Sequence, residues 1–287
     1  MKKIYFLSDL HLGARTLENP LENERRVVRW FDSVKEDASA IYLMGDILDY
    51  WYEYKTVVPR GFTRFFGKVA ELTDKGIDVH WFIGNHDIWI FDYLPGELGV
   101  KVHYTPEIVD LNGKTFYLAH GDGLGDTPLT FRFIRSVFHN RFCQKLYSAI
   151  HPRWTVAFAH KWSSHSRQTG NCKDYCGEEN EYLVRYAKAY LEKSSVHIDF
   201  FVFGHRHIML DLMIRRDSRV IILGDWINYF SYAVLEGEQI RWEQFEELHY
   251  CFKGLSGFSD AEILSAYLCA LLFGLFLYFL SKSKGHP

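Results

Sequence analysis

The chain has 287 residues, a formal net charge of −3, 48% hydrophobic residues and 17% aromatic residues. This length suits one large core, or one core with an inserted subdomain, in a globular protein. The net charge is too small to indicate a class of partner. Five scattered cysteines, an odd number, argue against a disulfide framework and favour ordinary thiols in a reducing compartment.

The first apolar run, residues 4–7, is followed by Asp9 and His11 and then by Gly13. A short apolar run ended by a turn signal predicts a buried strand. Extended backbone would point residues 9 and 11 the same way, so a carboxylate and an imidazole could share a metal. The run is too short for a secretory signal peptide, and we therefore expect a cytosolic body.

The same pattern recurs along the chain. Apolar segments end at Gly45-Asp46-x-x-Asp49, Gly84-Asn85-His86-Asp87, His120-Gly121-Asp122, Gly204-His205-x-His207 and Gly224-Asp225. Residues 22–34 and 62–72 have helical spacing of apolar positions instead. Near-continuous apolar strands that alternate with helices predict an α/β fold, in which ligands gather at the carboxyl ends of the strands. The sequence therefore predicts one site built from several strand ends.

The order and chemistry of five of these motifs resemble the calcineurin-like metallophosphoesterase superfamily, over residues 5 to about 226. The resemblance implies an α/β fold of two packed mixed β-sheets flanked by helices, in four αββα layers. The catalytic domain would span residues 1–250, with a helical lid inserted at 125–175 and a tail at 251–287. The implied metal ligands are Asp9, His11 and His207 for one ion, Asn85, His120 and His205 for the other, and Asp46 between them.

Mixed nitrogen and oxygen ligands suit Mn²⁺, Fe or Zn²⁺, and the resemblance implies manganese. Two such ions can clamp a phosphoryl group and lower the pKa of a bridging water. The superfamily counterpart of His86 is catalytic, and it stabilises charge on the phosphate or protonates the leaving group. We expect Asp49, Asp87 and Asp122 to orient the ligands.

The segment 129–173 contains no Asp or Glu, but it contains eight Lys or Arg residues interleaved with aromatic ones. Apolar residues every three or four positions predict amphipathic helices. A basic amphipathic helix is typical of a membrane-surface element, and the alternative is a solvated basic face over an ordinary core.

With this lid, the chain resembles the UDP-2,3-diacylglucosamine diphosphatase family of lipid A synthesis, which releases UMP and lipid X from a lipid-linked nucleotide sugar. Further likeness lies in residues 45–51, 139–141 and 163–164. The substrate-binding residues implied by position are Asn85, His86, Asp126, Ser164, Arg167 and His205. The chain departs from the family at His86, where Arg is usual, and at Gln168 and Asn171, where the family has Asn and Lys.

The segment 263–280 is 18 residues long and carries no charge, which is the lower limit for crossing a bilayer. It predicts membrane contact, and the alternative is a hydrophobic helix docked on its own domain or on a second copy. Together with the family resemblance, it suggests the cytoplasmic face of the inner membrane, either peripherally or through one C-terminal anchor.

Two other functions are compatible with parts of this pattern. A general phosphodiesterase or nuclease could use the basic lid to follow a nucleic-acid backbone, although the apolar tail disfavours a nucleic-acid partner. A scaffold could keep the fold without catalysis, but all seven expected metal positions are occupied by suitable residues. No protein partner is evident.

Overall fold

The computed structural model describes residues 2–15, 17–125, 128–156, 159 and 175–245. The chain divides into two units, Met1–Phe245 and Glu246–Pro287, and only the first contains described residues. The predicted apolar tail segment 263–280 therefore lies outside the described residues. Within the described ranges, no helix is long and apolar enough to cross a membrane.

Strands and helices alternate through the first half of the chain, as the apolar pattern predicted. In chain order the elements are β1 (Lys3–Leu7), α1 (Pro20–Val34), β2 (Ala38–Leu43), α2 (Thr63–Asp74), β3 (Asp78–Phe82), α3 (Tyr93–Leu98), β4 (Lys101–His103), β5 (Glu107–Leu111), β6 (Lys114–Ala119), α4 (Leu129–His139), α5 (Arg141–Ser148), α7 (Tyr182–Lys193), β7 (Phe200–Phe203), β8 (Met209–Arg215), β9 (Ser218–Leu223), β10 (Ser231–Glu236) and β11 (Gln239–Gln244).

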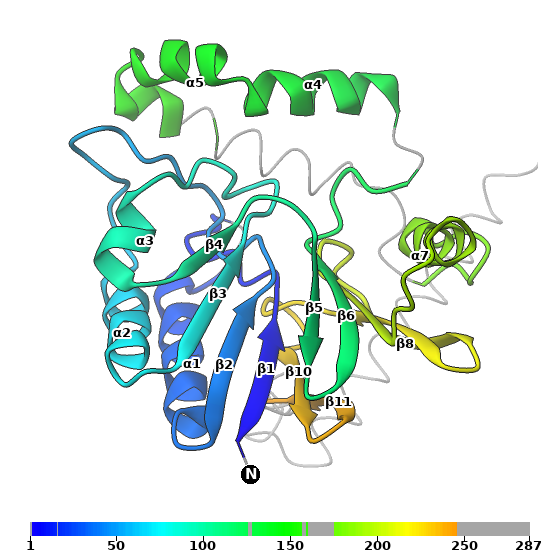
Figure 1. Cartoon of the computed structure of the whole chain (residues 1–287). Coiled ribbons are helices and arrows are strands. Elements are labelled where there is room, and N and C mark those ends of the chain that lie inside the picture. Colours follow the sequence, from blue (N-terminus) through cyan, green and yellow to red (C-terminus); the bar gives the residue numbers. More distant parts are fainter. Residues whose placement is uncertain (1, 16, 126–127, 157–158, 160–174, 246–287) are drawn as a thin grey trace, which may run out of the picture. The chain divides into compact units, whose positions relative to one another are not determined.

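The strands form two mixed sheets (Figure 1). The six-stranded sheet has the order β11-β10-β1-β2-β3-β4, and the five-stranded sheet has the order β5-β6-β7-β9-β8. Strands β1 to β4 are parallel to one another, as are β6, β7 and β9, whereas β10 runs antiparallel to β1. Because parallel strands end at the same edge of a sheet, their carboxyl ends can share one site.

Three apolar clusters separate four layers. The first lies between the six-stranded sheet and α1 and α2, the second between the two sheets, and the third between the five-stranded sheet and α7. Phe6 and Phe116, whose rings stack 5.8 Å apart, join the two sheets. This arrangement confirms the expected four-layer fold.

The lid helices α4 and α5 are attached to the body through an aromatic cluster that includes Tyr50, Tyr52 and Trp89. Trp89 Nε1 donates to Phe138 O at 2.9 Å, and Tyr52 Oη donates to Gln144 O at 2.7 Å. The body thus positions the described part of the predicted lid above residues that follow β2 and β3. The expectation of free thiols is wrong for Cys176, which is disulfide-bonded, whereas Cys143 is free.

Candidate metal centre

All seven predicted ligands are buried or partly buried, and each lies just after a strand. Asp9 and His11 follow β1, Asp46 follows β2, Asn85 follows β3, His120 follows β6, and His205 and His207 follow β7. Asp9, His11, Asp46 and His120 are buried, and the others are partly buried. The topology therefore brings side chains from five strand ends, almost 200 residues apart in sequence, into one cluster.

Three sets of side chains in this cluster could each hold a metal ion, since their ligand atoms lie within 4.8 Å of one another. The sets are Asp9, His11 and His207; Asp46, His120 and His205; and His11, Asp46 and His86. The first set is identical to one predicted ligand group, and the second joins Asp46 to His120 and His205 of the other predicted group. The third includes His86, which the sequence motif did not match to a ligand position.

The shortest separations join atoms that can all act as acceptors. His207 Nε2 lies 3.4 Å from Asp9 Oδ1, His120 Nε2 lies 3.4 Å from Asp46 Oδ2, and His11 Nε2 lies 3.3 Å from His207 Nε2. Asp9 Oδ1, His120 Nε2 and Asn85 Oδ1 are buried and have no hydrogen-bond partner. Buried polar atoms normally have hydrogen-bond partners, so three buried acceptors without one in a single cluster are suited to binding a cation.

Hydrogen bonds on the far side of each imidazole support this interpretation. His11 Nδ1 lies 3.2 Å from Asp49 Oδ1, His207 Nδ1 lies 3.0 Å from Asp225 Oδ2, and His120 Nδ1 lies 2.8 Å from Met44 O. Each of these bonds places a proton on Nδ1 and leaves the Nε2 lone pair facing the centre. Such outer hydrogen bonds are typical of histidines that bind metals. The residues present therefore fit a centre for divalent cations.

The electrostatics of the cluster likewise favour added positive charge. Burial alone would lower the pKa of His11, but hydrogen bonds to Asp49 and Asp9 outweigh it and raise the pKa to about 10. Burial opposes ionisation of Asp9, yet the neighbouring His207 and His11 lower its pKa to about 2. The carboxylates thus remain ionised and attract cations.

The backbone at the site is held in an uncommon conformation. Five predicted ligands have positive φ, with values of 56° for Asp9, 43° for His11, 53° for Asp46, 66° for His205 and 52° for His207. Non-glycine residues rarely adopt this region, and such strain is concentrated at functional sites. Glycines make the close approach possible, because a Cβ on Gly84 would lie 2.1 Å from Asp46 Oδ1.

The acidic residues expected to orient the ligands behave differently from one another. Asp49 contacts His11, as predicted. Asp87 instead accepts backbone hydrogen bonds from Asp46, Ile47, Leu48 and Gly84, so it fixes the turn that carries Asp46. Asp122 accepts from Arg135 Nε at 3.0 Å, and its expected role in orienting the ligands stays a prediction.

Two residues that help to hold the predicted metal ligands in place were not identified from the sequence. Asp225 contacts His207, although only its position after an apolar run was visible in the sequence. Arg206, between two predicted ligands, donates through Nε to both carboxylate oxygens of buried Glu181 at 3.0 and 3.1 Å. A charged residue between two predicted ligands could have indicated a role for Arg206, but its partner Glu181 depends on the packing of α7.

The predicted substrate residues Asp126, Ser164 and Arg167 lie outside the described residues.

The family model for calcineurin-like phosphoesterases matches residues 2–209. The chain therefore belongs to the calcineurin-like phosphoesterase family, as its five strand-end motifs predicted. It is a hydrolase that acts on a phosphate ester or pyrophosphate. Members of this family use a dimetal centre, in agreement with the candidate ligands of this chain.

Individual relatives indicate a narrower family within the calcineurin-like phosphoesterases. A UDP-2,3-diacylglucosamine hydrolase of Porphyromonas gingivalis is 47% identical over 261 residues, which cover 86% of this chain and 98% of the relative. A protein of the same name from Neisseria meningitidis is 27% identical over 248 residues, covering 83% of this chain and 96% of the relative. A solved phosphoesterase from E. coli is 16% identical, with a TM-score of 0.44, and the match covers 85% of this chain and 94% of that chain. The first of these matches places the chain in the UDP-2,3-diacylglucosamine hydrolase family, which confirms the second resemblance.

Proposed function

We propose that this protein hydrolyses the pyrophosphate bond of UDP-2,3-diacylglucosamine, giving UMP and 2,3-diacylglucosamine 1-phosphate (lipid X). The observation that carries the proposal is the 47% identity to a hydrolase of that name, over 98% of the relative's length. The orphaned acceptor atoms of the buried cluster support metal-dependent chemistry at the same strand ends.

In the proposed centre, Asp9, His11 and His207 hold one divalent ion, and Asn85, His120 and His205 hold the other. Asp46 lies between the two groups, because its Oδ2 is 3.7 Å from His11 Nε2 and 3.4 Å from His120 Nε2. We infer that the ions are Mn²⁺. When bound, such a pair clamps a phosphoryl group and lowers the pKa of bound water.

His86 is the proposed catalytic side chain. Its Nδ1 lies 3.0 Å from Asp49 O, which accepts the Nδ1 proton, and its Nε2 lies 3.9 Å from Asp46 Oδ2. The ring is therefore held with Nε2 toward the centre. Burial lowers the pKa of His86, and an anionic phosphate beside Nε2 would oppose this by favouring the imidazolium. His86 can then stabilise charge on the phosphate or give a proton to the leaving group.

Substrate binding is assigned to Asn85, His86 and His205 at the centre, and to Asp126, Ser164 and Arg167 by family position alone. Asn85, His86 and His205 are each partly buried, although Asn85 Oδ1 itself is buried. These residues would contact the phosphate, whereas the lid would receive the acylated sugar.

We further propose that the lid contacts the cytoplasmic face of the inner membrane. Leu129, Phe133, Phe142 and Trp154 are 79%, 70%, 69% and 69% exposed, and all lie in a stretch without acidic residues. Exposed apolar side chains among basic ones are typical of surfaces that bind anionic lipid. Co-sedimentation with anionic vesicles should weaken in Trp154→Glu, while Met213→Glu, at an exposed apolar residue of β8, should bind as wild type does.

Product analysis with the lipid nucleotide tests the activity. Mn²⁺-loaded protein in detergent should release UMP, and Asp46→Ala should lower that rate by more than about 100-fold, since loss of a ligand exceeds the effect of losing an outer partner. Release of UDP would indicate cleavage at the sugar and contradict the proposed bond. No release of UMP from metal-loaded wild-type protein would refute the proposed substrate.

A further inference from the structure

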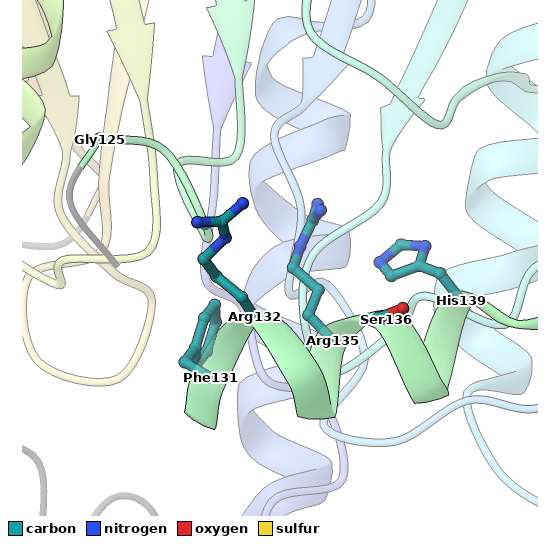
Figure 2. A pocket seen from close by; sticks show the side chains of 7 residues that line it. Gly125, Phe131, Arg132, Arg135, Ser136 and His139 are labelled. Atoms are coloured by element: carbon teal, nitrogen blue, oxygen red, sulfur yellow. The ribbon is translucent and has the colours of Figure 1, made fainter. Parts of the chain in front are cut away.

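A polar cavity of about 600 Å³ lies between α4 and the loop that follows β6 (Figure 2). Helix α4 contributes Phe131, Arg132, Arg135, Ser136 and His139 to its lining, and the loop contributes Gly123 and Gly125. This size is within the range of cavities that hold small ligands. None of these residues belongs to the predicted metal, catalytic or substrate-binding set.

The lining follows one face of α4. Arg132, Arg135 and His139 are spaced three and four residues apart, so they extend from the same side of the helix, as Figure 2 shows. Leu129 and Phe133, which are the most exposed apolar residues of α4, lie on a different face. Helix α4 thus separates a basic face over the cavity from an apolar face.

One hydrogen bond connects the cavity wall to the loop after β6, which carries the predicted ligand His120. Arg135 Nε donates to Asp122 Oδ2 at 3.0 Å, and Asp122 is two residues beyond the predicted ligand His120. The guanidinium of Arg135 also packs against Gly123, where an added Cβ would lie 3.0 Å from Nε. Arg135 is therefore engaged in holding α4 to the loop, and Asp122 compensates its charge.

Arg132 has a different environment. It lines the same cavity, it is exposed, and it forms no ion pair with any other described residue. A guanidinium that lines a polar cavity and has no acidic partner among the described residues is suited to a phosphate. Phe131 lies beside it with a partly exposed ring, which could pack against a planar base.

We propose that this cavity binds the nucleotide half of the substrate, with Arg132 on the uridylyl phosphate and Phe131 against the uracil ring. The assignment to UMP rests on the proposed function. The acylated half of that substrate needs apolar surface, which this cavity does not supply, whereas the nucleotide half offers a phosphate and a base. Arg132 is thereby a binding residue for the nucleotide half of the substrate rather than a ligand of the metals.

Binding of UMP to Mn²⁺-loaded, full-length protein, measured by calorimetry, tests this assignment. Arg132→Gln should weaken UMP about tenfold or more, because a charge-assisted hydrogen bond is lost. Arg216→Gln removes the same charge from the turn between β8 and β9 and should bind UMP as wild type does. Ribose 5-phosphate should bind more weakly than UMP, and Phe131→Ala should reduce that preference.

Equal UMP affinity in Arg132→Gln and wild type would overturn the proposal. If Arg132→Gln lost affinity for anionic vesicles but kept its affinity for UMP, the proposal would also be overturned, because Arg132 would then contact lipid phosphates. The test of UMP binding is independent of the test of the proposed activity. If the protein releases no UMP from UDP-2,3-diacylglucosamine yet binds UMP through Arg132, the substrate assignment fails and the nucleotide site stands.

Discussion

At the scale of single residues, the predicted ligands are held in place by atoms outside the cluster. Asp9 and His11 have positive φ, and their backbone N–H groups donate to Gly45 O at 3.1 Å and Asp46 O at 3.0 Å. The backbone of His205 donates to Asp9 Oδ2 at 2.8 Å. Positive φ at a non-glycine residue costs on the order of 1–3 kcal/mol, and these bonds between strand ends offset that cost. The ligand geometry is therefore stabilised by hydrogen bonds between the strand ends.

Asp225 provides a test of this arrangement at one residue. Its Oδ2 accepts from His207 Nδ1, and its Oδ1 accepts from the backbone N–H groups of Ile227, Asn228 and Tyr229. Asp225→Asn should keep the backbone bonds but weaken the orientation of His207. We expect Mn²⁺ affinity to fall about 10- to 100-fold. Metal titration followed by elemental analysis measures the change, and excess Mn²⁺ should restore activity.

Asp211→Asn serves as the matched control for that prediction, because Asp211 on the edge strand β8 pairs with Arg219 on the neighbouring strand β9. It should bind Mn²⁺ as wild type does. If Asp225→Asn also retained wild-type affinity, the contact with His207 would have no role in holding the metal.

At the scale of elements, the loop after β7 depends on α7. Arg206 lies between His205 and His207, and its guanidinium donates to both oxygens of Glu181, which immediately precedes α7 and is 2% exposed. Removing one partner of a buried ion pair leaves the other charge uncompensated, at a cost of about 3–5 kcal/mol. Glu181→Gln keeps a hydrogen-bond acceptor, so we expect the free energy of unfolding to fall by about 2 kcal/mol.

Urea unfolding with and without Mn²⁺ measures this effect, and the loss should be larger with metal because the ligand loop is also displaced. Glu178→Gln is a suitable control, since Glu178, in the turn before α7, forms an exposed pair with Lys188 of that helix. An exposed pair contributes less than about 1 kcal/mol. Equal destabilisation by the two substitutions would argue against a positioning role for Glu181.

The elements also show what sequence reasoning can and cannot reach. Residues 4–7, 79–83 and 115–119 are apolar runs that end in polar side chains, so both the strands and their functional ends could be predicted locally. Strands β8 and β11 have alternating burial and end in no such motif, and they were not predicted. The link between Asp225 and His207 depends on the pairing of β7 with β9, which is a long-range contact that no local pattern encodes.

At the scale of the whole described unit, the division into two sheets could not be derived from periodicity. The apolar segments alone predicted an α/β arrangement, and only the family resemblance implied two sheets. The division depends on β10, which returns from the far end of the unit to pair with β1 while β9 pairs with β7. The substrate prediction depends on family position at Asp126, Ser164 and Arg167 rather than on any local pattern, and these three residues lie outside the described residues.

A partly buried histidine, His80, also makes the stability of the unit depend on pH. His80 on β3 stacks on Tyr42 at 4.3 Å, and its Nδ1 lies 2.9 Å from Nε2 of His103 on β4. Burial, reinforced by His103 and Lys101, lowers the pKa of His80 to about 4. Between pH 6.5 and 4 the unfolded chain therefore takes up a proton at His80 that the folded chain does not. Stability is full above pH 6.5 and is lost as the pH falls through this window.

After allowance for solvent screening of a partly exposed ring, His80 should account for a loss of about 1–2 kcal/mol between pH 7 and pH 4.5. His80→Gln removes the titrating group, so its stability should fall less over the same interval. Urea unfolding of both proteins in chelator, at several pH values, isolates this difference because the metal ligands titrate identically in the two chains. At pH 7.5 and above, the difference between them should be constant, since the imidazole is neutral in both the folded and unfolded states. Parallel losses of stability down to pH 4.5 would mean that the folded chain protonates His80 as readily as the unfolded chain does.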